Sequence, residues 1–310
     1  MTRNFDIDTD PPTPELLEVA RKELRETPEL REASIKELRS LLKEATDLHY
    51  KDDDDFLLIF LRPCHFYPES ALKMMRRIAE FKKNYNNLLH NLMPEDEKRA
   101  FTEHNVVNVL ANRDQKGRRV LLVNCGALWD PKQVSSEQLF RLFYLIHLIA
   151  QLEPETQING AVVIMDFDGL SLKQVKALSP SFSKLLLTFI QEALPLRLKE
   201  VHIIKQPYIF KLVWALFTPF IKEKLNKRIF FHGSDMRKIH RFIDRELLPA
   251  NYGGDLPAMD YGGTEWYPCV FRHIDHINDW NTFGFVDDPQ LQKYRLKDVK
   301  FHENMSSQIC

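Results

Sequence analysis

Glycine is scarce in this sequence, with 10 residues among 310. Loops that bind nucleotide phosphates need glycine, because only glycine lets backbone amides approach the phosphate oxygens closely. Neither a GxGxxG turn nor a GxxxxGK[ST] loop occurs, and the GxSxG motif of many hydrolases is also missing. The sequence therefore contains no recognisable catalytic motif, and we predict no catalytic residues.

Cysteine is also rare, with four residues at positions 64, 125, 269 and 310. They lie far apart and form no CxxC pair, so neither a disulfide framework nor a zinc-finger pattern is indicated. The best metal candidate is instead the short cluster from His273 to Asp279, which contains two histidines and two aspartates. Its spacing matches no established site. We interpret it as a solvated surface and predict no metal.

Long apolar runs are absent. The longest nearly apolar stretch, from Leu139 to Leu152, has 14 residues and contains Arg141 and His147. A membrane-spanning helix needs about 20 apolar residues. The N-terminus has no apolar signal region, and Thr2 stands where N-myristoylation requires glycine. We therefore expect membrane contact to be peripheral.

The net charge of −1 argues against a globally basic nucleic-acid-binding protein, but the charge is unevenly distributed. Residues 1–60 contain 16 Asp and Glu against 9 Lys and Arg, whereas residues 197–228 contain 8 Lys and Arg against 2 Glu. The molecule is therefore electrically polarised.

The N-terminal third is predicted to be helical. Residues 1–12 are typical of a solvated acidic tail. Thr13 and Thr27 are each followed by proline and glutamate, which is the pattern of an N-cap and a first helical turn. Further helices are expected from about residues 52 and 68, so residues 13–101 form the predicted helical domain.

The hydrophobic period changes after this domain. Strands are expected at 106–111, 119–124, 161–168, 200–206 and 228–233, and helices at 136–151, 171–178, 181–193, 208–225 and 235–247. This alternation predicts an α/β domain with a largely parallel sheet over residues 102–265. The strand at 161–168 is continuously apolar, as in strands buried on both faces. Residues 266–310 are expected to be irregular.

Residues 205–228 combine an aromatic stripe with a basic cluster. The stripe consists of Phe210, Val213, Trp214, Phe217, Phe220 and Ile221. Such a helix can simply dock on the sheet. The lysines and arginine that follow it favour a second interpretation, in which the apolar face lies on an anionic membrane.

Six stretches carry a family resemblance: FLLIFLRPCHF (56–66), ALWDPK (127–132), EPETQINGAVVIMDFDG (153–169), PLRLKEVHIIKQPYIF (195–210), PFIKEKLNKRIFFHG (219–233) and LPANYGG (248–254). The sequence resembles the CRAL-TRIO lipid-binding family, and within it α-tocopherol transfer protein and its insect relatives, with clavesin and cellular retinaldehyde-binding protein near by. The resemblance implies a helical bundle packed on an α/β bowl that holds one hydrophobic ligand, with residues 208–225 as a movable lid.

The resemblance also implies site residues. The family's pocket positions fall on Phe140, Phe143, Tyr144, His147, Ala161, Val163, Met165, Leu186, Phe189 and Ile190. Its phosphoinositide-contacting positions fall on Arg197, Lys199, Lys224 and Arg228, while a further basic position is occupied by Cys64. Four of the pocket residues are larger or more aromatic than their counterparts in the tocopherol carrier, which predicts a cavity of another shape. His147 is either a ligand contact or a satisfied core residue.

The resulting hypothesis is a carrier, not an enzyme, that binds one tocopherol, retinoid, carotenoid or similar isoprenoid and moves it between membranes. Phosphoinositides would promote release, and no cofactor other than the lipid cargo is implied. The expected partners are the lipid and phosphoinositide-rich membranes, with no nucleic acid, and the expected location is the cytoplasm and the surface of endosomal membranes. The alternative is a phosphoinositide-binding trafficking adaptor of the clavesin type.

Overall fold

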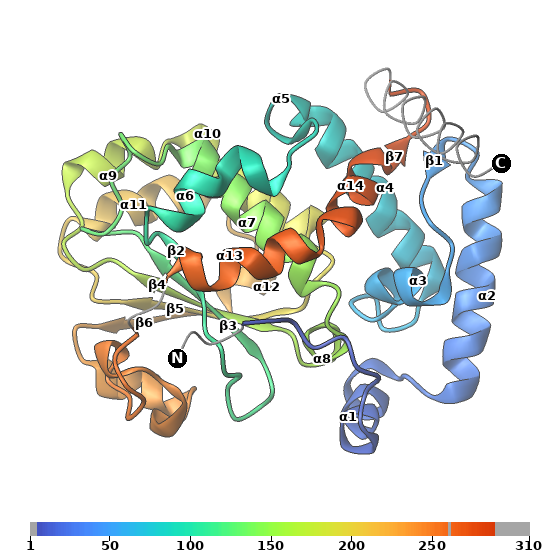
Figure 1. Ribbon diagram of the computed structural model, residues 1–310, viewed down its shortest axis with the longest axis horizontal. Helices are drawn as coiled ribbons and strands as arrows, with labels where there is room; N and C mark the ends of the chain where they lie inside the picture. Colours follow the sequence, from blue (N-terminus) through green and yellow to red (C-terminus); the bar gives the residue numbers. More distant parts are fainter. Residues whose placement is uncertain (1–4, 260–261, 289–310) are drawn as a thin grey trace, which may run out of the picture.

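A five-stranded sheet forms the centre of the protein. The computed structural model describes residues 5–259 and 262–288 (Figure 1). The strands lie in the order β2-β3-β4-β5-β6; β2 is antiparallel to β3 and the other pairs are parallel. Their bounds are β2 Val107–Val109, β3 Arg119–Asn124, β4 Ala161–Asp166, β5 Leu198–Ile204 and β6 Ile229–Gly233. The predicted α/β class with a mainly parallel sheet is confirmed.

The two faces of this sheet are covered differently. One face packs on short 3₁₀ turns within residues 236–252, which lie below the sheet in Figure 1. Helices α7, α10 and α11 lie over the other face. In β4, Val162 and Ile164 are fully buried, whereas Val163 and Met165 on the opposite face are only partly buried. The expectation of a strand buried on both faces is therefore wrong for the second face, because that face borders a cavity.

The helices over and beside the sheet begin at well-defined caps. Ser135 accepts a hydrogen bond from the Gln138 amide at the start of α7, and Ser179 accepts one from the Phe182 amide at the start of α10. The bounds are α7 Ser136–Ala150, α8 Pro154–Asn159, α9 Leu172–Ala177, α10 Pro180–Thr188, a π-helical turn Phe189–Ala193, α11 Phe210–Phe217 and α12 Glu223–Asn226.

Two predicted helices are interrupted. The helix expected over 208–225 is divided into α11, a 3₁₀ turn at Thr218–Phe220, and α12. Pro219 lies in that turn, and proline both lacks an amide donor and clashes with the preceding helical turn. The helix expected over 235–247 consists instead of the 3₁₀ turns Met236–Arg241 and Arg245–Leu247.

Helices α1 to α4 pack at one end of the sheet layers, whereas α6 lies beside α7 and α13 (Figure 1). Thr13 and Thr27 cap the first two helices as predicted, and Asp53 caps the third. The bounds are α1 Pro14–Leu24, α2 Pro28–Glu44, α3 Asp54–Leu61, α4 Pro68–Asn84, α5 Asn86–Leu89 and α6 Lys98–Thr102. The buried Arg62 donates hydrogen bonds to Glu26 and Gln157, and so joins these helices to α8.

The C-terminal part is helical up to residue 282. The expectation of an irregular segment is wrong for residues 266–285, which lie in α13 Gly263–Arg272, α14 Ile274–Thr282 and the short strand β7 Gly284–Phe285 or in the short links between them. Strand β7 pairs with β1, Leu48–His49. Trp280 of α14 is fully buried and stacks on Phe60, so this segment completes the core. Residues 289–310 lie outside the described residues.

Within residues 5–259 and 262–288, every helix is too short or too polar to cross a bilayer.

Candidate ligand-binding cavity

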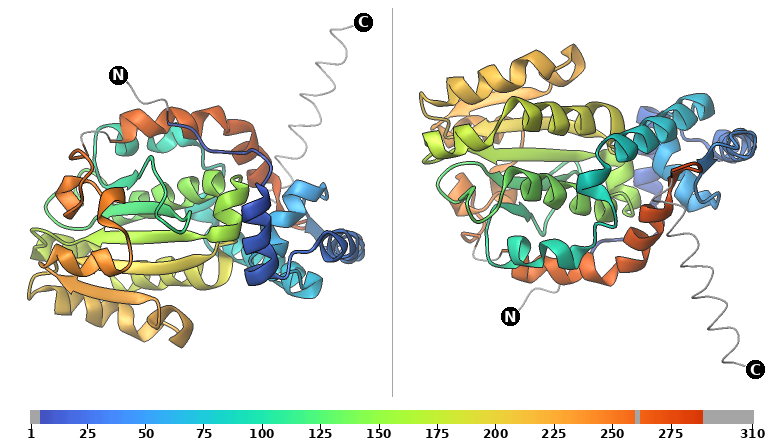
Figure 2. Two further views of the ribbon diagram at one scale, coloured as in Figure 1. Left: turned by 90° about the horizontal axis from the view of Figure 1, so that it is seen from below. Right: turned by 90° about the horizontal axis from the view of Figure 1, so that it is seen from above.

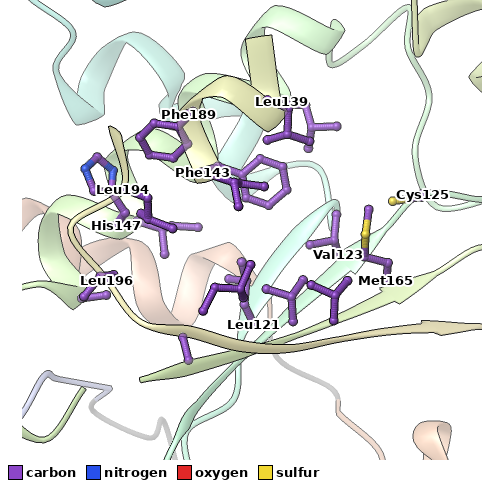
Figure 3. A pocket seen from close by; sticks show the side chains of 18 of the residues that line it. Leu121, Val123, Cys125, Leu139, Phe143, His147, Met165, Phe189, Leu194 and Leu196 are labelled. Carbon is purple, nitrogen blue, oxygen red and sulfur yellow. The ribbon is translucent and has the colours of Figure 1, made fainter. Parts of the chain in front are cut away.

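A largely apolar cavity of about 220 Å³ lies between the sheet and the helices (Figure 3). A water molecule needs only roughly 10–15 Å³ by the same kind of measure, so the cavity has room for an organic molecule. Its floor comes from β3, β4 and β5, and its walls come from α7, α10, α11 and α13. Figure 3 shows Leu121, Val123 and Met165 on the sheet side and Phe143 and His147 on the helix side.

Strand alternation explains the apolar floor. Successive side chains of a strand point to opposite faces. In β4, Ala161, Val163 and Met165 therefore face the cavity together, and Val201 and Ile203 of β5 extend the same surface. A carrier of a hydrophobic molecule needs this arrangement, because contact with apolar surface is what favours transfer out of water.

Eight of the ten pocket residues implied by the family resemblance line this cavity. They are Phe143, His147, Ala161, Val163, Met165, Leu186, Phe189 and Ile190. Phe140 and Tyr144 are buried but are absent from the lining. Phe140 packs between Phe81 and Phe189, and Tyr144 accepts a hydrogen bond from the Trp280 indole.

The difference at Phe140 and Tyr144 arises from the neighbours of α7. This helix contacts the cavity on one side, and α4 and α14 on the others. A helix that is apolar over a wide arc buries all of that arc, and its periodicity does not distinguish cavity from core. The cavity side is formed by Leu139, Phe143, Ile146, His147, Ile149 and Ala150.

His147 is the most unusual group in the wall. Its side chain is buried, and neither ring nitrogen has a hydrogen-bond partner. The ring packs edge-on against Tyr144 and Phe189, at centroid distances of 4.7 and 4.9 Å. Burial lowers the pKa of His147 to about 3, so the imidazole is neutral at physiological pH and offers one donor and one acceptor.

The cavity wall also contains one ion pair, whose opposite charges neutralise each other. Arg119 and Glu153 line it, and the guanidinium of Arg119 donates two hydrogen bonds to the carboxylate of Glu153. Arg113 and Thr156 contact the same carboxylate. Burial alone would raise the pKa of Glu153, but the two arginines outweigh it and lower that pKa.

Helix α11, which lies within the predicted lid, presents much of its aromatic stripe to the cavity. Of the predicted lid residues, Phe210, Val213, Trp214, Phe217 and Ile221 line the cavity, whereas Phe220 does not. The exposed side of this region carries Tyr208, Leu212 and Phe231, whose exposed fractions are 84%, 42% and 47%. The aromatic stripe therefore faces mainly the cavity, as in the first of the two interpretations, and other apolar side chains of this region meet solvent.

The N-terminal strap, residues 5–8, covers another part of the cavity. Figure 2 shows it running from beside α13 to the start of α1. Phe5 and Ile7 line the cavity, and Arg272 of α13 donates a hydrogen bond to the Phe5 carbonyl at 2.6 Å. The expectation of a solvated tail is therefore wrong for Phe5 and Ile7. Residues 1–4 lie outside the described residues.

The strap brings together three groups that are potential metal ligands. Donor atoms of Asp6, Cys269 and His273 lie within 4.8 Å of one another. Arg272 already pairs with Asp6 at 3.1 Å, and burial raises the pKa of Cys269 to about 12, so the thiol is protonated. We interpret this cluster as a set of contacts that holds the strap against α13.

The four predicted basic residues, Arg197, Lys199, Lys224 and Arg228, are here called the basic rim, and two of them contact α1. Arg197 and Lys199 both bind the carboxylate of Glu23, at 2.8 and 2.9 Å. Burial and then the nearby charge of Arg197 lower the pKa of Arg228, which also donates to the Leu198 carbonyl.

The last member of the rim, Lys224, lies near Cys64 and His65 of the FLLIFLRPCHF stretch. Burial lowers the pKa of His65, and the positive charges of Arg197 and Lys224 add to that effect. The neighbouring Cys64 is partly buried, and burial raises its thiol pKa to about 11 although Arg77 and Lys224 oppose the change. An uncharged thiol therefore occupies the position at which the family resemblance implies a further cation.

Comparison with known proteins places these features in context. The CRAL/TRIO domain profile matches residues 103–254. Clavesin-1 of Pongo abelii is 34% identical over 253 residues, which cover 81% of this chain and 71% of that protein. Clavesin-2 of Homo sapiens is 33% identical over 278 residues, or 88% and 84% of the two chains.

A solved structure supports the fold independently. The crystal structure of Sfh5 covers 80% of this chain and 97% of its own, with a TM-score of 0.50 and 15% sequence identity. At this level of identity the similarity concerns the fold alone.

Proposed function

This chain belongs to the CRAL/TRIO family, and its membership supports a role in lipid binding or transfer. We propose that the protein carries one hydrophobic lipid at a time between membranes. The observation that supports this proposal most strongly is the apolar cavity between the sheet and α7, α10 and α11. An apolar space of this kind shields a lipid from water while the lipid moves between membranes. No covalent step is required.

The uptake of a lipid has a simple driving force. Burying apolar surface stabilises a complex by about 25 cal/mol per Å², so several hundred Å² contribute on the order of 10 kcal/mol before entropy costs. The cavity supplies this surface from Val163, Met165 and their neighbours, while its charged pair is already compensated. Shape then selects among lipids, because a close-packed wall tolerates changes in volume poorly.

His147 indicates where in the cavity the polar end of the cargo would lie. A buried polar group without a partner costs roughly 1–3 kcal/mol, and a hydrogen bond from a ligand removes that cost. A tocopherol, a retinoid or another isoprenoid with one hydroxyl or carbonyl group meets this requirement. The hydrocarbon part would then extend along the apolar floor, away from His147.

Release requires contact with the receiving membrane. Tyr208, Leu212 and Phe231 give the lid region an apolar outer surface, and the basic rim adds positive charge. Each Lys or Arg near an anionic membrane contributes about 1 kcal/mol. If the open lid binds the membrane better than the closed lid, the membrane shifts the equilibrium towards release.

A transfer assay tests this proposal. Donor vesicles would contain fluorescent tocopherol or retinol, and acceptor vesicles would contain a quencher, with or without phosphatidylinositol bisphosphate. We expect the parent protein to accelerate transfer and the bisphosphate to increase the rate further. A protein that neither binds nor moves either probe would contradict the carrier function for these lipids.

The alternative is a trafficking adaptor that binds phosphoinositides while its cavity lipid remains in place as a structural component. The similarity to clavesins keeps this candidate open. It predicts binding to phosphoinositide vesicles without any exchange of the bound lipid. The same assay therefore separates the two functions.

A further inference from the structure

The basic rim is not an empty anion site, because an acidic side chain of α1 already occupies part of it. The carboxylate oxygen Oε2 of Glu23 accepts hydrogen bonds from Arg197 Nη2 at 2.8 Å and from Lys199 Nζ at 2.9 Å. One oxygen thus bridges two cations that belong to β5 and the residue before it. The Glu23 side chain is 45% exposed, so an outside ligand can reach the contact.

Local forces on α1 do not explain this position of Glu23. The residue lies in the last turn of α1, which ends at Leu24, and the helix dipole disfavours a negative charge there. Burial would also raise the pKa of Glu23. The hydrogen bonds from Lys199 and Arg197 outweigh this and lower the pKa, so the carboxylate is held ionised by the rim.

We infer that Glu23 is an internal competitor that sets how much negative charge a lipid headgroup needs in order to bind the basic rim. The inference rests on the proposed function, since it concerns the same rim. The chemistry of the preferred ligand is a headgroup with more than one phosphate, held in a membrane.

The competition follows from effective concentration. A carboxylate attached to the same chain acts at an effective concentration in the millimolar range, which a singly charged headgroup does not readily exceed. A phosphomonoester carries about −1.5 to −2 charges and three acceptor oxygens. A headgroup with two such phosphates can replace Glu23 at Arg197 and Lys199 and also contact Lys224 and Arg228.

The ion pairs of Glu23 also connect the acidic and the basic parts of the sequence. The acidic segment 1–60 contains Glu23, and the basic segment 197–228 contains the whole rim. Their attraction at Arg197 and Lys199 joins α1 to the sheet, and residues 9–13 connect the N-terminal strap to α1. Lys224 is exposed and has no ion pair among the described residues, so it remains available for the first encounter.

The test compares Glu23→Gln with Glu37→Gln, which removes the same charge from an exposed position of α2. Binding of the full chain would be measured to vesicles of phosphatidylcholine with phosphatidylserine, or with phosphatidylinositol bisphosphate. Ion pairs of this exposure contribute up to about 1 kcal/mol, so Glu23→Gln should strengthen binding to phosphatidylserine vesicles about threefold to fivefold. Discrimination between the two vesicle types should fall, and Glu37→Gln should behave like the parent.

Two further results separate the inference from the proposed function. If Glu23→Gln and Glu37→Gln give the same affinities while Arg228→Ala weakens binding to bisphosphate vesicles, the competitor is refuted and the rim remains a headgroup site. If Arg228→Ala and Lys224→Ala also leave binding unchanged, the rim itself is refuted. Inorganic phosphate at matched ionic strength that displaces the protein from bisphosphate vesicles would show a general anion site and overturn the inference.

Discussion

The two faces of the central sheet are built by the same strands, yet one is filled and the other borders a cavity. On the filled face, Val162 and Ile164 pack on Ile239, Ile243 and Tyr252 without residual exposure of the strand residues. On the other face, the alternate residues of the same strand meet open space. Side-chain type therefore does not distinguish core from binding site. What differs is the covering layer, which is a set of close 3₁₀ turns on one face and longer helices on the other.

The buried histidines show the same contrast. On the filled face, the ring of His202 lies 3.0 Å from a nitrogen of His232 and 3.3 Å from Glu200, and Glu200 also pairs with Arg118. In the cavity, His147 has no hydrogen-bond partner. His202 therefore has partners within the protein, whereas His147 in the cavity has none.

The largest expected effect compares two neighbouring residues of β4. Ile164→Ala should lower the free energy of unfolding by about 3 kcal/mol, because it leaves a void in a filled core. Met165→Ala on the cavity face should cost less than about 1 kcal/mol without ligand, because its side chain already borders open space. Denaturant titrations measure both values. Equal losses would contradict the difference between the faces.

The next effect concerns pH. The pKa of His147 is lowered from 6.5 to about 3 in the folded protein because burial disfavours the imidazolium. Between these values only the unfolded chain binds the proton, so stability is lost as the pH falls below 6.5, by about 1.4 kcal/mol per pH unit. The variant His147→Phe should remove this part of the slope. An unchanged slope between pH 6.5 and 4.5 would show that His147 is not buried as described.

A smaller effect is expected from filling the cavity. Val163→Trp should reduce the affinity for fluorescent retinol or tocopherol at least about tenfold, since overfilling costs typically 1–3 kcal/mol, while the protein stays folded. The matched change Val162→Trp should instead lower the free energy of unfolding by about 1–3 kcal/mol, because that side faces the filled core. Normal ligand binding by a folded Val163→Trp protein would remove this position from the site.

The smallest effect concerns the outer surface of the lid region. The double change Tyr208→Ser with Leu212→Ser should weaken vesicle binding severalfold, since each removes apolar surface that would enter the interface. Phe271→Ser is the control, because Phe271 is similarly exposed on α13. Equal binding by all three proteins would exclude the lid surface as the membrane contact.

Much of the fold could be predicted from the sequence, because the signals for those elements depend on residues that are close together in the chain. Caps such as Thr13 and Thr27 and the apolar runs of the strands act over a few residues, so their elements were placed well. The missed features depend on distant contacts. Helices α13 and α14 carry polar residues on one side and become stable through burial of Trp266 and Trp280 against far parts of the chain.

In the candidate site, too, the features set by nearby residues could be predicted and those set by distant contacts could not. Strand alternation placed Ala161, Val163 and Met165 on one face correctly, and this face lines the cavity. The contribution of Phe5 and Ile7 could not be predicted, because nothing near them in the sequence indicates that an acidic segment returns to α13. Likewise, the pairing of Glu23 with the basic rim joins positions 174 and 176 residues apart. The uneven distribution of charge along the sequence was the one feature that indicated an attraction between these two segments.

The most direct test of the account is native mass spectrometry of the protein purified from its natural source, followed by identification of the released lipid. The account predicts one lipid per chain, with a long hydrocarbon part and a single hydroxyl or carbonyl end, and a loss of that lipid in Val163→Trp. A chain that is empty at natural abundance, or one that retains the same lipid in Val163→Trp, would contradict it.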